Sequence, residues 1–335
     1  FSLPYLSTQP LNPLACPDGM QQTVASLLYE GLFHLDTALA PQPVLCASYT
    51  YDAEALTYTL TLRPNAVFSD GSPLTAADVK TTLTAAKASP RYSERLTDLK
   101  SVSGSGSTVT LTLNRANSAL PALLDIPILK SGTEKQDIPI GTGPYKLTSI
   151  DLATSAMLER NDDYRLAPAA IEKVELRYVG DRSTASVQLE TGDLDIMSID
   201  PSQLVSFENN DKFTVEKVQT LKTALLAINT TVAPLDNKLV RQAMTYAVDK
   251  KSVITIAYEN CAVPARLQAS DTNCFGVDFS DATDFSYNPE KAKELLAEAG
   301  YPNGEGYPTI EYSCNDAGYH VPLAEYLQQA WGDLG

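Results

Sequence analysis

The chain has 335 residues, and at about 150 residues per domain this length predicts roughly two domains. It carries 25 Lys plus Arg against 41 Asp plus Glu, a formal net charge of −16, which argues against a nucleic-acid backbone as partner because phosphates require clustered cations. The composition, 44% hydrophobic and 20% charged, is that of a globular protein, and no apolar run reaches the roughly 18 to 20 residues of a membrane-spanning helix.

The first elements expected along the chain are a strand, a helix and a second strand. Residues Phe1–Leu6 are mostly apolar and predict a strand that runs into a loop. Residues Gln21–Tyr29 place their apolar side chains on one helical face, and Gly31 suits the end of that helix. Residues Leu56–Arg63 alternate strictly between apolar and polar types, which predicts a half-buried strand.

A mostly β region with one or two helices is expected from about residue 45 to residue 155. Thr75 and Asp78 have the spacing of a capping box, so a helix is predicted over residues 75–87. Residues Ser101–Leu113 predict a hairpin, because Gly104–Ser107 separates two short β segments.

From Ile171 the pattern changes to alternating strands and helices, which predicts α/β layers. Residues Thr223–Asn229 form a nearly continuous apolar run of the type that is buried on both faces of a sheet. Asn288 and Pro289 suit the start of a helix. The other strands are expected at Lys173–Val179, Asp193–Met197 and Thr309–Ser313, and the helices at Ser183–Thr191, Asp236–Ala257, Glu290–Ala299 and 322–334.

The sequence offers little for catalysis or metal binding. Its two histidines are His34, which follows an expected helix end and favours a surface role, and His320. No G-x-S-x-G motif accompanies them. Cys314, Asp316 and His320 lie close in sequence, but a metal site would need further His or Cys ligands nearby. The carboxylates are dispersed, which favours a solvated acidic surface over a paired general acid and base.

The cysteines and the glycine loop favour structural roles as well. The five cysteines lack C-x-x-C spacing, and either a Cys261–Cys274 disulfide or isolated buried thiols would fit them. The loop Gly141–Tyr145 is not a phosphate cradle, because Pro144 and a strand-like segment follow it instead of a helix. Binding therefore remains the default activity of a large acidic α/β protein.

Several segments, in order along the whole chain, resemble the family 5 extracellular solute-binding proteins of ABC importers, which include oligopeptide-, dipeptide- and nickel-binding proteins. The resemblance rests on Leu11–Leu14, Tyr29–Phe33, Leu56–Arg63, Val67–Val79, the turn Ile140–Tyr145, Arg160–Tyr164, Leu189–Asp193, Ile228–Thr230, Val240–Asp249 and Asn288–Gly304.

The resemblance implies an α/β fold of the periplasmic-binding-protein-like type II, with two lobes that close by a hinge around a solute. Lobe I would comprise residues 1–44 and 161–257, with a mostly β subdomain inserted at 45–160. Residues 258–335 would begin a lobe II that is incomplete, because the family's second lobe continues past a segment like Leu327–Gly335.

The implied function is that of the substrate-binding component of an ABC importer. It would capture extracellular peptides or peptide-like solutes in the cleft between the lobes and deliver them to permease subunits, as a monomer without cofactor, metal, nucleic-acid partner or enzymatic activity. It would act as a lipid-anchored protein on the outer face of the cell membrane or in the periplasm. The alternatives are a nickel or other metal-chelate binder of the same family, a secreted hydrolase, and a folded remnant that binds nothing.

The resemblance also places family cleft positions on this chain. Arg91 would offer a fork of donors to a ligand carboxylate, against the alternative of a solvated surface arginine. Met20 and Tyr92 would line an apolar pocket or belong to the core, and Asn229 would bind ligand or satisfy a strand end. The candidate ligand-binding residues are Thr8, Gln9, Met20, Gln22, Arg91, Tyr92 and Asn229.

Overall fold

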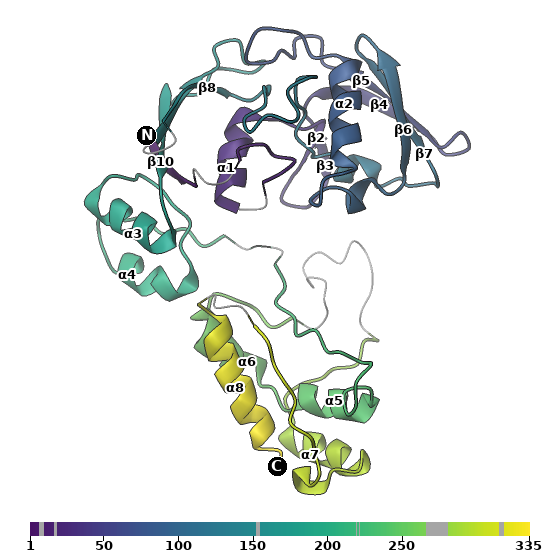
Figure 1. Ribbon diagram of the computed structural model, residues 1–335, viewed down its shortest axis with the longest axis vertical. Coiled ribbons are helices and arrows are strands. Elements are labelled where there is room, and N and C mark those ends of the chain that lie inside the picture. The colour runs from purple at the N-terminus through teal and green to yellow at the C-terminus, as the bar shows by residue number, and fades with distance from the viewer. Residues whose placement is uncertain are drawn as a thin grey trace. The chain divides into compact units, whose positions relative to one another are not determined.

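The computed structural model describes residues 1–6, 10–16, 19–151, 155–218, 220, 222–265, 281–314 and 318–335. The chain forms two compact units, Phe1–Ser198 (unit 1) and Ile199–Gly335 (unit 2). Unit 1 contains the sheets, and the described part of unit 2 contains helices joined by extended segments (Figure 1). In the described ranges, no helix is both long enough and apolar enough to cross a membrane.

The first sheet of unit 1 brings the two ends of this unit together. Its strand order is β1-β10-β9-β8, and β1 and β10 run parallel, with Ser2 opposite Glu175. Helix α1 (Gly19–Leu28) packs beside this sheet, and the predicted strand at the N-terminus, the helix after it and the strand near residue 175 are confirmed. The strands are β1 (Ser2–Tyr5), β8 (Tyr145–Asp151), β9 (Ser155–Arg160) and β10 (Lys173–Tyr178).

The second sheet of unit 1 is antiparallel, with strand order β4-β5-β7-β6. The apolar side chains Tyr58, Leu60 and Leu62 of β5 are buried, whereas the threonines between them face away from the core, as the strict alternation predicts. Strands β6 and β7 form the predicted hairpin. The strands are β4 (Cys46–Asp52), β5 (Thr57–Leu62), β6 (Leu99–Ser105) and β7 (Thr108–Leu113), and a separate pair is β2 (Phe33–Leu35) with β3 (Pro41–Pro43).

Helix α2 (Ala76–Ala86) covers the buried face of the second sheet and begins where the capping box predicts. The Asp78 carboxylate accepts hydrogen bonds from the backbone N–H and the hydroxyl of Thr75, at 2.9 and 2.6 Å. Its second oxygen accepts the backbone N–H of Ser131 at 2.9 Å. These donors allow Asp78 to be buried at the start of the helix, since each buried acceptor has a partner.

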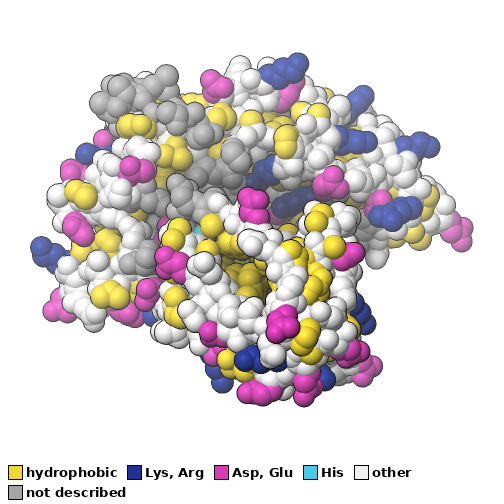
Figure 2. Space-filling view, turned by 60° about the horizontal axis from the view of Figure 1, so that its bottom comes forward, with side chains coloured by type: hydrophobic (Ala, Val, Ile, Leu, Met, Phe, Trp, Pro, Cys, Tyr) yellow, Lys and Arg dark blue, Asp and Glu magenta, His cyan; other side chains and the backbone are white. Residues whose placement is uncertain are grey.

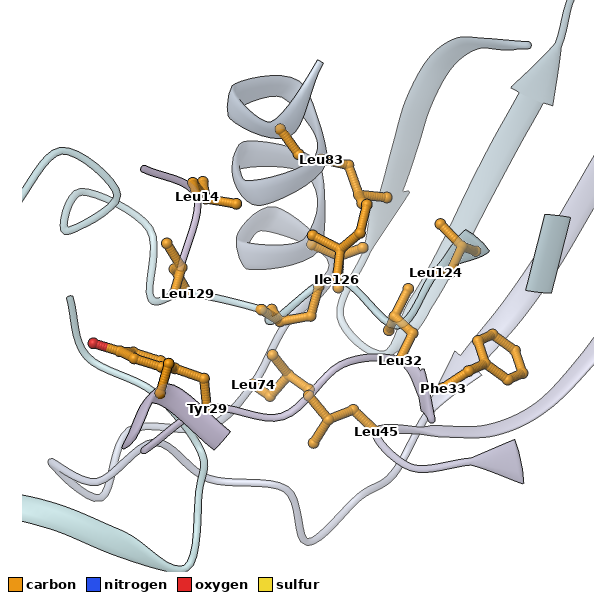
Figure 3. Packing of buried hydrophobic residues seen from close by; sticks show 14 of the residues in the cluster. Leu14, Tyr29, Leu32, Phe33, Leu45, Leu74, Leu83, Leu124, Ile126 and Leu129 are labelled. Carbon is orange, nitrogen blue, oxygen red and sulfur yellow. The ribbon is translucent and has the colours of Figure 1, made fainter. Parts of the chain in front are cut away.

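The core of unit 1 lies between α2, the second sheet and the segments before and after η2 (Leu120–Leu123). Leu83 of α2, Ile126 and Leu32 belong to this cluster, and all three side chains are fully buried (Figure 3). Burying each such side chain stabilises the fold by roughly 1.5–3 kcal/mol. This core holds in place the segment after α1, whose residues Tyr29 to Phe33 are quoted above for the resemblance.

The glycine loop is the structural turn that its sequence predicts. Gly143 donates its backbone N–H to the carbonyl of Leu28 at 2.9 Å, and β8 begins directly after Pro144. A Cβ atom on Gly141 would lie 2.2 Å from that same carbonyl oxygen, and one on Gly143 would lie 2.5 Å from the carbonyl oxygen of Leu27. The loop therefore needs glycine because its backbone packs against the end of α1.

Helix α3 completes unit 1, and unit 2 is built around helices α5 and α7. Val240 and Ala243 of α5 pack with Leu295 and Leu296 of α7, and all four are buried. Trp331 of α8 donates its indole N–H to a carbonyl of α5 at 3.1 Å. The helices are α3 (Arg182–Thr191), α4 (Leu204–Glu208), α5 (Lys238–Tyr246), α6 (Lys250–Tyr258), α7 (Pro289–Glu298) and α8 (His320–Gly332), with short 3₁₀ turns at Glu94–Leu96 (η1), Pro201–Gln203 (η3) and Pro302–Gly304 (η5).

The single helix predicted over Asp236–Ala257 is wrong, because the structure has two helices there. The first begins at Lys238 and the break falls after Ala247. Asp249 caps the second helix, since its carboxylate accepts the backbone N–H of Lys251 at 3.0 Å and the hydroxyl of Ser252 at 2.7 Å. An aspartate side chain that bonds nearby backbone in this way competes with helix continuation.

Three of the predicted strands are absent from the described structure. Residues Asp193–Met197 run beside β1 but bond to it chiefly through the Asp195 carboxylate, which accepts the backbone N–H of Ser2 at 2.7 Å. Residues Thr223–Asn229 are extended without a partner strand, and their side chains are not buried: Leu225 is 59% exposed. Residues Thr309–Ser313 likewise pair with no described strand. A strand requires a ladder partner, which an apolar pattern alone does not supply.

Candidate functional site

A hollow of about 590 Å³ opens on unit 1 between α1, strand β2 and the segment that follows α2. Its apolar wall includes Phe33, Leu35, Val44 and Pro127. Its polar wall gathers arginines and carboxylates from segments that are distant in sequence. The polar and charged lining residues are Gln22, Ser26, Tyr29, Glu30, His34, Arg91, Tyr92, Arg95, Asp125 and Arg165.

Three of the predicted ligand-binding residues meet at this hollow. Gln22 reaches it from α1, and Arg91 and Tyr92 reach it from the turns that follow α2. An Nη of Arg91 donates to Oε1 of Gln22 at 2.9 Å, although the two residues lie 69 positions apart. The convergence agrees with the cleft positions that the resemblance implies for these three residues, while their role in ligand binding stays a prediction.

The ring of Tyr92 contacts the guanidinium groups of two arginines. Its side chain is buried, with 4% of its surface exposed. The guanidinium of Arg91 lies 5.2 Å from the ring centroid and that of Arg95 lies 5.4 Å from it. Both distances are within the range of a cation–π interaction, which positions the two positive charges next to each other at the hollow.

The charges in the hollow are unequally paired. Arg95 forms an ion pair with Asp125 at 2.5 Å, and Arg165 forms one with Glu30 at 2.8 Å. Arg91 pairs with no carboxylate in the part of the chain that the structure describes, and its bond to Gln22 is a bond to a neutral amide. The hollow therefore presents one uncompensated guanidinium fork, the kind of group that binds a carboxylate in a bidentate manner.

A buried network holds Glu30 at the edge of the hollow. Its carboxylate accepts the hydroxyl of Tyr164 at 2.6 Å and two N–H groups of Arg165 at 2.8 and 3.3 Å. Thr142 adds a hydroxyl at 3.3 Å. Burial, together with the bond to Glu30, raises the pKa of Tyr164, so this phenol stays a neutral donor. The network fixes the segment after α1 to the loop that follows β9.

Met20 and Asn229 each make contacts within their own unit. Met20 is half-buried and packs, with Leu6, against the small cluster of Val179, Ala185 and Leu194 in unit 1. Asn229 belongs to unit 2, where its side-chain oxygen accepts the backbone N–H and the hydroxyl of Thr231 at 3.0 and 2.7 Å. Neither contact tests their proposed contact with a ligand. Thr8 and Gln9 lie outside the described residues.

The hollow and the network around Glu30 also contain residues that the sequence analysis missed. Arg95 follows Arg91 by one helical turn, and Glu30 and Tyr164 both lie within segments that carry the resemblance, so these signals were present in the sequence. Asp125 and Arg165 had no such signal, because each is recognised only through its ion-pair partner. His34, which was expected at the surface, is exposed and lines the same hollow.

The described residues hold no group of three or more His, Cys, Asp or Glu side chains that could bind a metal ion. The ring of His320 lies tilted against that of Tyr319, with 4.2 Å between the ring centroids, and Asp316, the proposed neighbour in a metal site, lies outside the described residues. Cys16 and Cys46 are buried, whereas Cys274 lies outside the described residues, so a disulfide with Cys261 stays a prediction. Acidic side chains are scattered over the face shown in Figure 2 and do not gather in one patch.

The family model for bacterial extracellular solute-binding proteins, family 5, matches residues 40–335 of the chain. The chain belongs to this family. A glutathione-binding protein GsiB from Pectobacterium atrosepticum is 30% identical over 340 residues, and the match covers 97% of this chain and 65% of that protein. The corresponding protein of Escherichia coli K12 is 28% identical with the same coverage. The chain thus spans about 65% of the length of these curated relatives.

Solved structures confirm the type II periplasmic-binding-protein-like α/β fold. NikA from Brucella suis, in complex with Fe(III)-EDTA, has a TM-score of 0.82 at 23% identity and is matched over 100% of this chain and 73% of its own. The ABC transporter substrate-binding protein CtaP from Listeria monocytogenes has a TM-score of 0.82 at 26% identity, over 100% and 72%. AppA from Bacillus subtilis, in complex with a nonapeptide, has a TM-score of 0.73 at 23% identity, over 100% and 73%.

Proposed function

We propose that the protein is the solute-binding component of an ABC importer and that it captures peptides or peptide-like acids through a carboxylate bound at Arg91. The observation that carries this proposal is the charge arrangement of the hollow. Arg95 and Arg165 are neutralised by Asp125 and Glu30, whereas Arg91 donates to the neutral amide of Gln22 and has no carboxylate partner among the described residues. Membership of the family supports the general activity of solute binding. The charges of the hollow support the more specific proposal that the solute carries a carboxylate.

The neighbouring side chains suit the capture of such an acid. The hydrogen bond to Gln22 holds the guanidinium of Arg91 in place before a ligand binds. A ligand carboxylate is a stronger acceptor than this amide oxygen and can replace it. Tyr92 orients the same guanidinium from beneath. The half-buried side chains of Leu35, Val44 and Pro127 provide an apolar surface for a hydrocarbon side chain of the solute. With a chain charge of −16, a local positive centre is also needed to attract an anion.

The solute class follows from the carboxylate and from the relatives. Peptides and glutathione both present carboxylates, and two relatives of this chain are named as glutathione-binding proteins. Metal chelates such as Fe(III)-EDTA, the compound in the NikA complex, also present carboxylates and form the alternative class. The proposal favours peptides because main-chain hydrogen bonds supply affinity that does not depend on side-chain identity.

The proposal includes the organisation expected for such a receptor. Residues 1–44 and 161–257 would form lobe I, residues 45–160 its inserted subdomain, and residues 258–335 the start of lobe II. The receptor would close on its solute by a hinge and then dock on permease subunits as a monomer. It would act outside the cytoplasm, lipid-anchored or periplasmic, without a cofactor, a nucleic-acid partner or enzymatic activity. The boundary between the two compact units falls between Ser198 and Ile199, whereas the proposed lobe boundary follows residue 257. The lobe bounds therefore rest on the resemblance alone.

The test is isothermal titration of the full-length protein with glutathione, with a mixed short-peptide library and with Ni(II)-histidine. The wild-type protein is expected to bind a peptide or glutathione, and Arg91→Met is expected to raise the Kd at least tenfold. Hydrogen bonds from a guanidinium to a carboxylate are charge-assisted, and bonds of this kind support an effect of this size even at the exposed side chain of Arg91. Arg91→Lys should recover part of the affinity, because it restores the charge without the fork.

The matched control is Arg115→Met, which removes an arginine of the same unit that does not line the hollow. It should leave the Kd unchanged. Binding of the metal chelate alone would replace the peptide proposal with the chelate alternative. Peptide binding that is equally strong in Arg91→Met would refute the role of Arg91 while the family function stands.

A further inference from the structure

Two ion pairs line the hollow, and they differ in how much bonding capacity they leave to a ligand. The pair of Glu30 and Arg165 is closed, because each side chain is 10% exposed. The two oxygens of Glu30 already accept four hydrogen bonds, which uses the acceptor positions of a carboxylate. The pair of Arg95 and Asp125 is open: its side chains are 36% and 30% exposed, and a single hydrogen bond from Nη1 to Oδ1, at 2.5 Å, joins them.

The open pair offers one free acceptor whose charge is already balanced. Oδ2 of Asp125 accepts no hydrogen bond from any residue that the structure describes. A ligand ammonium at this oxygen would lie beside the guanidinium of Arg95, and a ligand carboxylate at the pair would lie beside the carboxylate of Asp125. A charged group of either sign therefore meets a like charge, which opposes its binding. The group that suits this acceptor is a neutral N–H donor.

Tyr92 places the open pair next to the arginine that lacks a carboxylate partner. The guanidinium groups of Arg91 and Arg95 lie 5.2 and 5.4 Å from the centroid of the same Tyr92 ring. One short ligand can therefore contact both Arg91 and the open pair. The C-terminal end of a peptide offers the two groups required, because its carboxylate and the amide N–H of its last residue are attached to the same Cα atom.

We propose that Asp125 determines the specificity of the hollow: its Oδ2 accepts the last amide N–H of a peptide whose terminal carboxylate is bound by Arg91. This inference rests on the proposed function, because it takes the carboxylate at Arg91 as given. By neutralising Arg95, Asp125 also disfavours a second carboxylate beside the first, and such a repulsive element is a common source of specificity. Peptides are thereby preferred over dicarboxylic acids and carboxylate-rich chelators. Glutathione fits too, since its two carboxylates lie at opposite ends.

The test is isothermal titration of the full-length protein with three probes. Trialanine carries the terminal carboxylate and the last amide N–H. Its ester analogue, alanyl-alanyl-lactate, replaces that N–H by an oxygen atom, and glutarate carries two carboxylates. The wild-type protein is expected to bind trialanine at least tenfold more tightly than either of the other probes. A hydrogen bond to a charged acceptor supports an effect of this size.

Asp125→Asn removes the charge of Asp125 with almost no change in side-chain size. Arg95 then loses its counter-charge, so glutarate should bind at least fivefold more tightly than it does to the wild type. The preference for trialanine over its ester should fall at least threefold. The matched control is Asp162→Asn, which removes the same charge from a pair with Arg160 that does not line the hollow, and it should change neither quantity. Equal weakening of all three probes in Asp125→Asn would show a merely structural role and would overturn the inference.

The titrations also separate this inference from the proposed function. Equal affinity of the wild type for trialanine and its ester, with binding still lost in Arg91→Met, overturns the inference and leaves the proposed function standing. Binding of trialanine that is unaffected by Arg91→Met contradicts the proposed function itself. A wild-type protein that binds none of the three probes overturns the inference, because trialanine carries both groups on which it rests.

Discussion

The buried ion pair between Glu30 and Arg165 gives the sharpest stability prediction for unit 1. Each side chain is only 10% exposed, and Tyr164 and Thr142 add hydroxyls to the same carboxylate. Replacement of Arg165 by Met would leave a buried carboxylate without its counter-charge. Breaking a buried pair from one side costs about 3–5 kcal/mol, because the remaining ion is desolvated and unpaired.

This cost translates into a measurable thermal shift. For a folding unit of this size, 1 kcal/mol moves the Tm by about 2–4 °C, so Arg165→Met should lower the Tm of unit 1 by about 6–20 °C. The assay is thermal unfolding of the full-length protein followed by circular dichroism. Adding Glu30→Gln to Arg165→Met should raise the Tm again, because the buried charge is then removed.

The matched control is Lys173→Met, which breaks a pair with Glu159 whose side chains are 65% and 39% exposed. Its effect should be much smaller, because exposed pairs are screened by solvent. The reasoning is refuted if Arg165→Met loses no more stability than this control. It is equally refuted if the double variant is less stable than Arg165→Met alone.

Three further predictions concern local interactions in unit 1. Burial opposes the ionisation of Asp70, but hydrogen bonds, first from Lys130, lower its pKa to about 2. The protein should therefore lose about 1 kcal/mol of stability, after allowance for solvent screening, as the pH falls from about 4 to about 2. If the urea midpoint of Asp70→Asn depends on pH in this range as that of the wild type does, this prediction is contradicted. Thr75→Ala should cost about 1 kcal/mol in urea unfolding through loss of the hydrogen bond from its hydroxyl to Asp78, whereas an unchanged midpoint would show that this bond contributes nothing. Gly141→Ala should cost about 1–3 kcal/mol in the same assay, because its Cβ meets a carbonyl of α1 at 2.2 Å, and a neutral result would mean that the loop can move aside.

The elements that the sequence predicted correctly are those whose stabilising partner is local or whose period is regular. Residues 56–63 alternate over the whole strand, and the box of Thr75 and Asp78 defines a helix start by itself. Gly141 was correctly interpreted as part of a turn because no helix follows it. In each case the deciding interactions lie within a few residues of one another.

The errors have the opposite cause. The apolar run Thr223–Asn229 predicts a buried strand only if other strands flank it, and in the described structure none does. The apolar face of Asp236–Ala257 continues across the break between α5 and α6, so periodicity hid the break. The signal that could have revealed it was Asp249, which is followed three residues later by Ser252 and suits a helix cap.

The candidate site shows the same division. Arg91 and Gln22 were proposed from the resemblance, and the structure brings them within hydrogen-bond distance. The sequence could not predict that Arg91, and not Arg95 or Arg165, lacks a carboxylate partner among the described residues. This outcome depends on Asp125 and Glu30, which reach the other two arginines from distant segments. Charge pairing is a property of the tertiary structure and not of any motif.

The most direct test of the central claim is native mass spectrometry of the full-length protein, purified without unfolding from the cells that produce it. We expect a bound small acid, a peptide or a peptide-like compound, that is present in the wild type and absent from Arg91→Met. A metal chelate in its place would contradict the proposed solute class. A wild-type protein that carries no solute, and whose Tm does not rise with millimolar glutathione or peptides, would contradict the proposed function itself.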